Sequence, residues 1–156
     1  MINLIKLTES AQAPVYATEK SACFDVSADI LNREITFMSN SNEKRKYEIK
    51  DALTIPPQYR VLIPTGFIWK LSEGYELNFL SRSGNTWKNG IIVLNSPAVI
   101  DEDYDKESFV ILYNASNEYF RVEQGQRIAQ GKVSRVERCG FESGGERLGG
   151  FGSTGS

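Results

Sequence analysis

The stretch "YELNFL" (residues 75–80) decides the fold class of this chain. In it Tyr75, Leu77 and Phe79 alternate with polar residues, a period of two that puts the three apolar side chains on one face of a β-strand. A helical pattern would instead repeat every three to four residues. The stretch therefore predicts a strand with one buried face.

Similar strand-length runs recur along the chain with turn residues between them. They are "INLIKL" (2–7), "CFDVSADI" (23–30), "RVLIP" (60–64), "GFIWKL" (66–71), "GIIVLN" (90–95), "FVILYN" (109–114) and "RIAQGKVSRV" (127–136). Pairs such as Pro56-Pro57 and Asn89-Gly90 supply turn chemistry. Only "RSGNTWK" (82–88) has room for a short turn of helix. Many short strands at this spacing predict an all-β sandwich, jelly roll or barrel.

Bulk composition narrows the classes of function. The 156 residues suit one domain, and 40% hydrophobic with 24% charged residues is ordinary globular composition. A net charge of −2 argues against nucleic acid as the main partner. There is no apolar run long enough for a membrane span, and "MINLIKLTES" lacks the order of a secretory signal. Two widely spaced cysteines indicate neither a zinc site nor a disulfide framework, so a reducing cytoplasm is expected.

The chain contains no histidine. Nucleophile systems that depend on histidine, and the common zinc sites, are thereby excluded. Any chemistry must be carried by carboxylates, hydroxyls, arginines or a metal bound through oxygen.

One candidate for such chemistry is "NSPAVIDEDYDKES" (95–108). Its apolar strand "AVI" is followed by Asp101, and a carboxylate at the end of an apolar strand can orient and deprotonate a water molecule. Tyr104 offers a flat face to a ring. The segment taken alone is equally consistent with a solvated acidic turn.

Phosphate-binding residue types gather in "SRSGNTWKNG" (81–90). Arg82, Ser83 and Gly84 offer a guanidinium, a hydroxyl and an unobstructed backbone N–H to phosphate oxygens. Elsewhere, Asp25 stands among apolar neighbours in "ACFDVSA", where a carboxylate needs a partner or metal-bound water.

The chain ends in the glycine-rich "RLGGFGSTGS" (147–156). So few apolar side chains cannot order a segment by burial, which favours a frayed tail. Arg147, Ser153 and Thr154 are nevertheless phosphate-binding types, and glycines let backbone N–H groups approach a ligand.

In their order along the chain these segments resemble the five motifs of the trimeric dUTP diphosphatase (dUTPase) family. The motifs are "SACFDVSA", "SRSGNTWKNGI", "NSPAVIDEDY", "GQRIAQGKV" and "RLGGFGSTG", within residues 21–155. The resemblance implies an all-β, distorted jelly-roll or β-barrel subunit in a homotrimer with shared active sites and Mg²⁺ as cofactor. It implies hydrolysis of dUTP to dUMP and pyrophosphate, which limits uracil incorporation into DNA and supplies dUMP for dTMP synthesis. Residues 1–146 would form the β domain, and 147–156 a flexible arm that closes over the nucleotide.

The resemblance also assigns a role to each site residue. Asp101 matches the carboxylate that activates water, Tyr104 the ring packed on deoxyribose, and Asp25 the carboxylate that holds magnesium through water. The other substrate-binding positions are Arg82, Ser83, Gly84 and Gln130 at the phosphates, Asn95, Ala98, Val99 and Ile100 at uracil, and Arg147, Phe151, Gly152, Ser153 and Thr154 in the arm.

The segment "FMSNSNEKRKYEIK" (37–50) has a polar tip between two β-prone pieces, and relative to the family it reads as an insertion. Its polarity favours a solvated hairpin, with a docking surface for a protein partner as the alternative.

Two other functions compete with dUTP hydrolysis. A dCTP deaminase of the same fold would need a glutamate base where this chain has Ile111. A nucleotide-sensing regulatory module would recruit its partner at residues 37–50. The expected compartment is the cytoplasm, or the host cytoplasm if the protein is viral.

Overall fold

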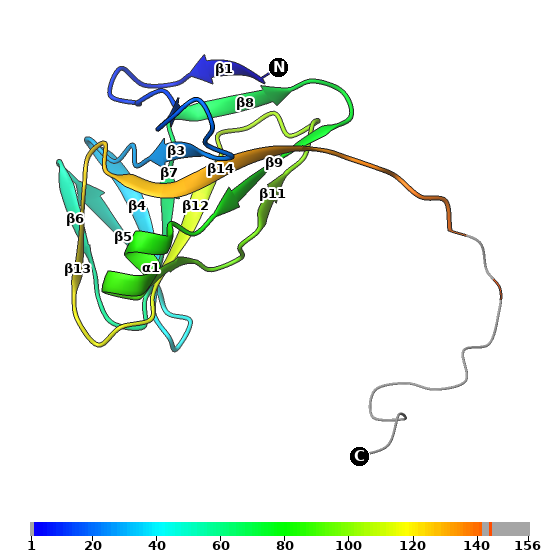
Figure 1. The fold of residues 1–156 in the computed structure, drawn as a ribbon. Coiled ribbons are helices and arrows are strands. Elements are labelled where there is room, and N and C mark those ends of the chain that lie inside the picture. Colours follow the sequence, from blue (N-terminus) through cyan, green and yellow to red (C-terminus); the bar gives the residue numbers. More distant parts are fainter. Residues whose placement is uncertain (1, 142–143, 145–156) are drawn as a thin grey trace.

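The computed structural model describes residues 2–141 and residue 144, and most of the regular structure in them is strand (Figure 1). The elements are β1 (Ile2–Lys6), β2 (Val15–Tyr16), β3 (Phe24–Ser27), β4 (Arg33–Met38), β5 (Lys44–Ile49), β6 (Ala52–Ile55), β7 (Arg60–Pro64), β8 (Phe67–Leu71), β9 (Tyr75–Leu80), α1 (Ser83–Asn89), β10 (Ile91–Val93), β11 (Ala98–Ile100), β12 (Phe109–Asn114), β13 (Phe120–Glu123) and β14 (Arg127–Arg135). The all-β prediction is confirmed. Among the described residues, no helix has the length and apolar character to cross a bilayer.

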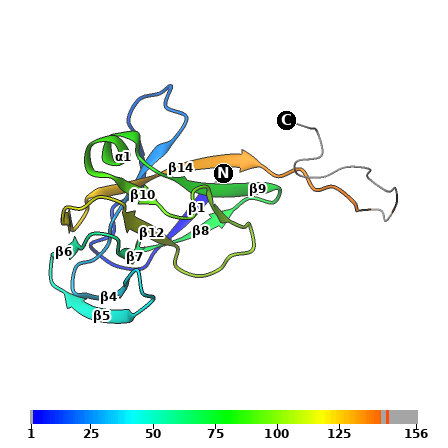
Figure 2. The same cartoon turned by 90° about the horizontal axis from the view of Figure 1, so that it is seen from below.

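Two antiparallel five-stranded sheets make up the body. One has the order β10-β12-β7-β4-β5 and the other β11-β9-β14-β3-β2, while β1 with β8 and β13 with β6 form short ribbons. Figure 2 shows the layers from below, with β9 and β14 on one side and β4 and β5 on the other. The two sheets, as described, share no strand, so the jelly-roll prediction holds in its sandwich form and a closed barrel is not needed.

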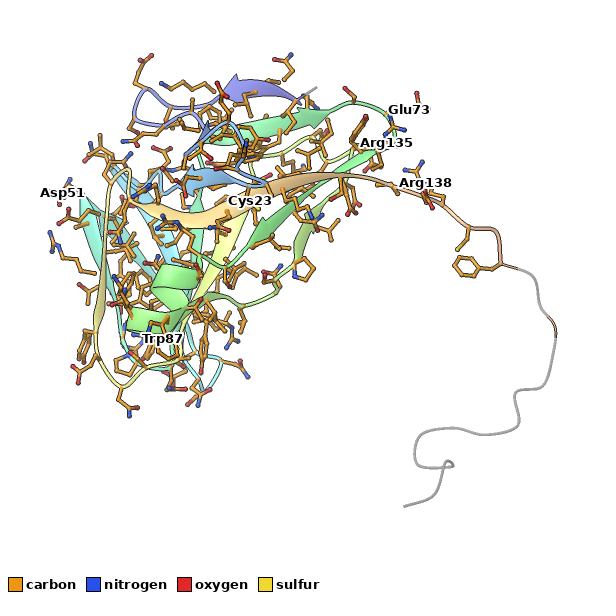
Figure 3. The ribbon with its side chains drawn as sticks, viewed as in Figure 1. Cys23, Asp51, Glu73, Trp87, Arg135 and Arg138 are labelled. Carbon is orange, nitrogen blue, oxygen red and sulfur yellow. The ribbon has the colours of Figure 1, made fainter. Side chains whose placement is uncertain are left out.

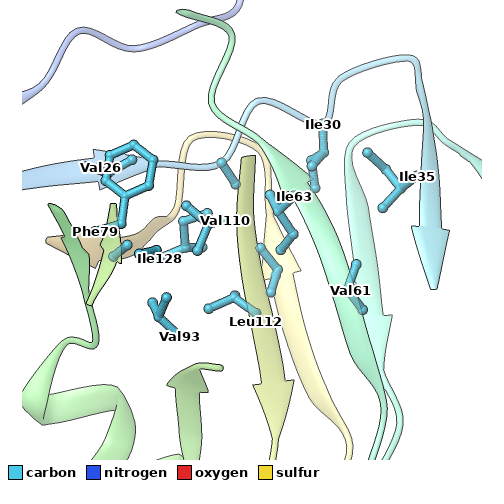
Figure 4. Close-up of a cluster of buried hydrophobic side chains, with 14 of the residues drawn as sticks. Val26, Ile30, Ile35, Val61, Ile63, Phe79, Val93, Val110, Leu112 and Ile128 are labelled. Carbon is cyan, nitrogen blue, oxygen red and sulfur yellow. The ribbon is translucent and has the colours of Figure 1, made fainter. Parts of the chain in front are cut away.

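The core lies between these sheets (Figure 4). On β9, Leu77 and Phe79 are completely buried, as the alternation predicts, while Tyr75 is half-buried at the strand end. Val110 of β12 and Ile63 of β7, in the opposite sheet, belong to the same core and have no exposed surface. Each such side chain stabilises the fold by roughly 1.5–3 kcal/mol, so the packed core fixes which face of each strand points outward.

A glycine on β14 allows a close contact in this core. The Phe24 ring stacks on Trp69, with ring centroids 5.5 Å apart. A Cβ at Gly131 would lie 2.1 Å from the Phe24 ring, so only glycine fits there. The neighbouring Gln130 pairs with Asp25 of β3 and with Leu80 of β9.

Residues 33–49 form a hairpin of β4 and β5, with Met38 opposite Lys44 and Arg33 opposite Ile49. It begins earlier in the chain than the expected segment 37–50. Asn42 near its tip has φ of 62°, which asparagine tolerates better than most residues. Of β5, only Ile49 is buried.

Candidate active site

Strand β14 brings three of the sequence motifs together. Gln130 lies opposite Asp25 of β3 on one side and Leu80 of β9 on the other. The chain leaves β9 directly into Arg82, whose Nε donates to Asp25 Oδ1 at 3.1 Å. The first, second and fourth motifs thus meet at one end of this sheet.

Asp25 has a second cationic partner. Arg127 Nη1 donates to its other carboxylate oxygen at 3.1 Å. The expected need for a partner is therefore met by two arginines, which compensate the partial burial of the charge. Sequence reasoning missed Arg127. The available signal was that Arg127 lies three residues before Gln130 on the same strand.

The short helix α1 forms one wall of a pocket of about 260 Å³. Arg82 is its N-cap, with extended backbone, and Gly90 ends it in the left-handed conformation with φ of 64°. The pocket is lined by Arg82, Ser83, Gly84, Asn85, Lys88, Asn89 and Gln130. The predicted phosphate residues are brought together here. Trp87 projects from α1 away from the body and is 89% exposed (Figure 3).

A second pocket, of about 290 Å³, forms around β11. It is lined by Leu62, Asn95, Ala98, Val99, Ile100, Asp101, Tyr104, Ser108, Phe109 and Ile111. Asp101 follows β11 directly, and its carbonyl accepts the Tyr104 N–H at 3.2 Å, which closes a turn. The carboxylate and the ring that the sequence singled out therefore share one pocket.

Neighbouring contacts hold this turn in place. Glu102 accepts hydrogen bonds from Arg138 and from the Gly74 N–H. The Arg138 guanidinium is the main cause of a lowered pKa for the Glu102 carboxyl, and the Gly74 N–H adds to it. Glu102 thus stays charged beside Asp101 and fixes the turn to the β8–β9 connection. Arg138 itself lies on the segment that leaves the body after β14 (Figure 3).

The two pockets have no lining residue in common. The pocket around β11 holds the carboxylate and the aromatic ring, and it is here called the nucleoside pocket after the role that the sequence predicts for them. The pocket around α1 holds the arginine, the lysine and the amides, and it is here called the phosphate pocket after the role that the sequence predicts for its residues. The expected arm residues Arg147, Phe151, Gly152, Ser153 and Thr154 lie outside the described residues.

The sequence assigned magnesium to Asp25, acting through water. The described residues contain no group of three or more acidic or cysteine side chains placed to hold a metal. Magnesium, however, commonly keeps several waters and binds one or two carboxylates together with substrate phosphates. Asp25 is one carboxylate next to the phosphate pocket, through its contact with Arg82, and its position is consistent with the predicted magnesium role.

Comparisons with known proteins identify the family of this chain. The dUTPase family model matches residues 46–143. The chain belongs to the dUTPase family. A deoxyuridine 5'-triphosphate nucleotidohydrolase of Wolinella succinogenes is 41% identical over 99% of this chain and 93% of its own length. One from Chlamydia trachomatis is 38% identical over 96% of this chain and 95% of its own.

Solved dUTPase structures share the fold at lower identity. The dUTPase of Staphylococcus bacteriophage 80alpha with dUPNHPP superposes with a TM-score of 0.74 at 19% identity, covering 100% of this chain and 99% of that one. The D95N dUTPase of phage phi11 of S. aureus, described with a structural Mg(II) ion, gives 0.73 at 16% identity over 94% and 97%. At such identity these likenesses show the dUTPase architecture alone.

Proposed function

We propose that this protein hydrolyses dUTP to dUMP and pyrophosphate. The observation that carries the proposal is the nucleoside pocket, where Asp101 and Tyr104 line one cavity and the strand β11 forms its wall. An exposed carboxylate at the end of β11 suits general-base catalysis, because a base must reach both water and substrate. Family membership supports the same activity.

Asp101 is the proposed general base. It takes a proton from a water molecule, whose oxygen attacks phosphorus in line with the bond to the leaving pyrophosphate. That bond breaks, and its electron pair leaves with the pyrophosphate oxygen. Tyr104 packs against deoxyribose, while Asn95 and the backbone of Ala98, Val99 and Ile100 bind the uracil edge.

The phosphate pocket would hold the triphosphate. Arg82 and Lys88 supply positive charge, and Ser83, Gly84 and Gln130 supply hydroxyl, N–H and amide donors. Preorganised donors of this kind stabilise charge that develops on phosphoryl oxygens. Magnesium, held by Asp25 through water, would neutralise further charge on the triphosphate.

We infer that the active sites are shared between chains of a homotrimer. A triphosphate bound in the phosphate pocket needs a base and a sugar-binding ring, and both lie in a separate pocket of the same chain. Two pockets without a common wall can serve one substrate when neighbouring copies place them face to face. The arm 147–156 would then complete each site.

A complementation experiment tests both the activity and the sharing of sites. Asp101→Asn and Arg82→Gln are each expected to lose dUTP turnover, measured as pyrophosphate release. Unfolding and refolding the two variants together should restore turnover, because some mixed sites then carry both intact residues. Turnover no higher than the sum of the separate variants would contradict shared sites, and a wild type inactive on dUTP would contradict the proposed function.

The competing functions find less support. Ile111 lines the nucleoside pocket where a deaminase would require glutamate, and isoleucine cannot transfer a proton. On the hairpin, the edge strand β5 carries Lys44, Arg45 and Lys46, and charged residues on an edge protect it from pairing with other chains. This favours a solvated hairpin over a protein-docking surface. A pull-down with and without residues 38–46 tests the choice.

A further inference from the structure

Glu107 is hydrogen-bonded to a residue of the nucleoside pocket and also belongs to a network of charged side chains. Its main-chain carbonyl accepts a hydrogen bond from the Tyr104 hydroxyl at 3.1 Å. Its side chain, only 14% exposed, accepts two hydrogen bonds from the Arg33 guanidinium, at 2.8 and 2.7 Å. The residue therefore touches the pocket through its backbone and is anchored through its carboxylate.

Arg33 is also bound to a second carboxylate, that of Asp29, which is deeply buried. Arg33 Nη1 also donates to Asp29 Oδ2 at 2.9 Å, and the Asp29 side chain is 1% exposed. Thr8 and Ser10 donate to the same carboxylate, each at 2.6 Å. The Arg33 guanidinium thus makes two hydrogen bonds to the Glu107 carboxylate and a third to the Asp29 carboxylate. Together these bonds hold it in one orientation.

The tight turn between β7 and β8 also forms hydrogen bonds with Glu107 and Ser108. The Gly66 N–H donates to Glu107 Oε1 at 2.9 Å, and Thr65 Oγ1 donates to the Ser108 carbonyl at 2.8 Å. Gly66 has φ of 74°, and a Cβ there would come within 2.7 Å of Asp29. Backbone and side chain of Glu107 are thus fixed at several points.

Tyr104 is more exposed than Glu107, to which it is hydrogen-bonded. It is 38% exposed on the wall of the nucleoside pocket, and its hydroxyl bond to the Glu107 carbonyl ties its outer end to the fold. A ring that excludes a substituent must keep its position when that substituent pushes against it. The rigidity of Glu107 therefore governs how well the ring can exclude a ribose hydroxyl.

We propose that the Arg33–Glu107 ion pair is a positioning device for Tyr104 and sets the discrimination between deoxyribo- and ribonucleoside triphosphates. The inference rests on the proposed function, because it deepens the role of the same pocket. Neither residue needs to touch substrate. Both act by keeping the Glu107 carbonyl where it can hold the Tyr104 hydroxyl.

The measurement is the ratio of kcat/KM for dUTP to that for UTP. Glu107→Gln keeps the side-chain shape but replaces one oxygen facing the arginine fork with an NH₂ group. We expect the ratio to fall about tenfold, the size of effect that follows from losing a charge-assisted hydrogen bond. Arg33→Lys keeps the positive charge but cannot make the paired guanidinium bonds to Glu107. Its ratio should therefore lie between those of Glu107→Gln and the wild type.

Two controls separate positioning from general stability. Val122→Ala removes buried core volume on β13, outside both pockets, so it should lower the melting temperature and leave the ratio unchanged. Glu34 lies next to Arg33 on β4 and forms an exposed ion pair with Lys46 of β5. Glu34→Gln breaks that pair and should change neither the melting temperature nor the ratio. A ratio that simply followed stability across these variants would overturn the proposal.

Tyr104→Phe tests the link itself without disturbing the charges. It should lower the ratio by about as much as Glu107→Gln, and the double variant should fall no further, because both changes break one connection. An unchanged ratio in Tyr104→Phe, or additive effects in the double variant, would contradict the inference even if Glu107→Gln failed to fold. A wild type that hydrolyses no dUTP would overturn the proposed function and this inference together. Normal dUTP turnover with unchanged ratios would overturn the inference alone.

Discussion

The guanidinium of Arg82 donates to the carboxylate of Asp25 at 3.1 Å, although 57 residues separate them in the chain. Arg82 also reaches the Arg127 carbonyl at 3.4 Å. These contacts hold the entrance of α1 against strands β3 and β14. The proposed phosphate site is therefore built on the sheet and is not carried by a free loop.

Asp101→Asn should lower kcat by about 10²–10⁴-fold while nucleotide binding stays near the wild-type value, because the amide keeps the shape and cannot accept the proton. Turnover and the Kd of a non-hydrolysable dUTP analogue check this. Asp103→Asn, in the same exposed turn, is the matched control and should retain turnover. Near-native kcat in Asp101→Asn would reassign water activation to another group.

The wild type should prefer dUTP to both UTP and dTTP by about 10²-fold or more in kcat/KM. Tyr104 would collide with a ribose 2′-OH, and a 5-methyl group would collide with the segment that carries Asn95 and Ala98. In Tyr104→Ala the preference over UTP should shrink. Tyr119→Ala, an exposed tyrosine outside both pockets, should leave it intact. Comparable rates on dUTP and UTP in the wild type would remove this role from Tyr104.

Arg82→Gln should lower kcat/KM for dUTP by about 10²-fold, because a charged donor to the phosphates is lost. Arg121→Gln is the control, since its exposed ion pair with Glu123 at 3.2 Å contributes little. Steady-state kinetics on the two variants make the comparison. Equal effects would show that the phosphate pocket has no special role.

Acid should destabilise the protein through Asp29. Burial tends to raise the pKa of this carboxyl, but hydrogen bonds from Ser10, Thr8 and Arg33 outweigh it, so the pKa lies below the ordinary value of 3.8. The unfolded state then binds the proton more readily, so this stabilisation is complete above the unfolded pKa and is lost as the pH falls through the folded pKa. Asp29→Asn should lower the free energy of unfolding by about 3 kcal/mol at neutral pH. It should also make the fall in melting temperature below about pH 4 less steep than in the wild type. A parallel acid profile in wild type and variant would contradict this.

Deleting residues 147–156 should leave the melting temperature nearly unchanged and lower kcat at least about 10²-fold. The deletion removes little apolar surface but takes away Arg147, Ser153 and Thr154, proposed donors to the triphosphate. Deletion of 155–156 alone, which spares all three, is the control and should retain turnover. Native turnover without 147–156 would show that the segment has no part in catalysis, and a collapsed melting temperature would show that it is structural.

The strands and their buried faces could be predicted because their signals are local. The alternation in "YELNFL" put Leu77 and Phe79 on one face, and "RSGNTWK" gave the helix that became α1. Short elements were missed: β2, β6 and β13 span two to four residues, too few for a periodic pattern to stand out. At β3, the apolar run extended the prediction to residue 30, whereas pairing ends at Ser27.

The candidate residues were named by motif, but their partners came from strand register and from turns distant in sequence. Arg127 reaches Asp25 because β14 pairs with β3. Glu107 reaches Arg33 because β12 and β4 both pair with β7, which places the start of β4 close to the segment before β12. Neither spacing nor residue type encodes such long-range pairings, which arise only when the two apolar faces pack together. The sequence determined which side chains could do the chemistry. The tertiary structure decided which of them share a pocket and which arginine steadies which carboxylate, because a charge in a partly buried site is stable only where the packed backbone brings it a partner.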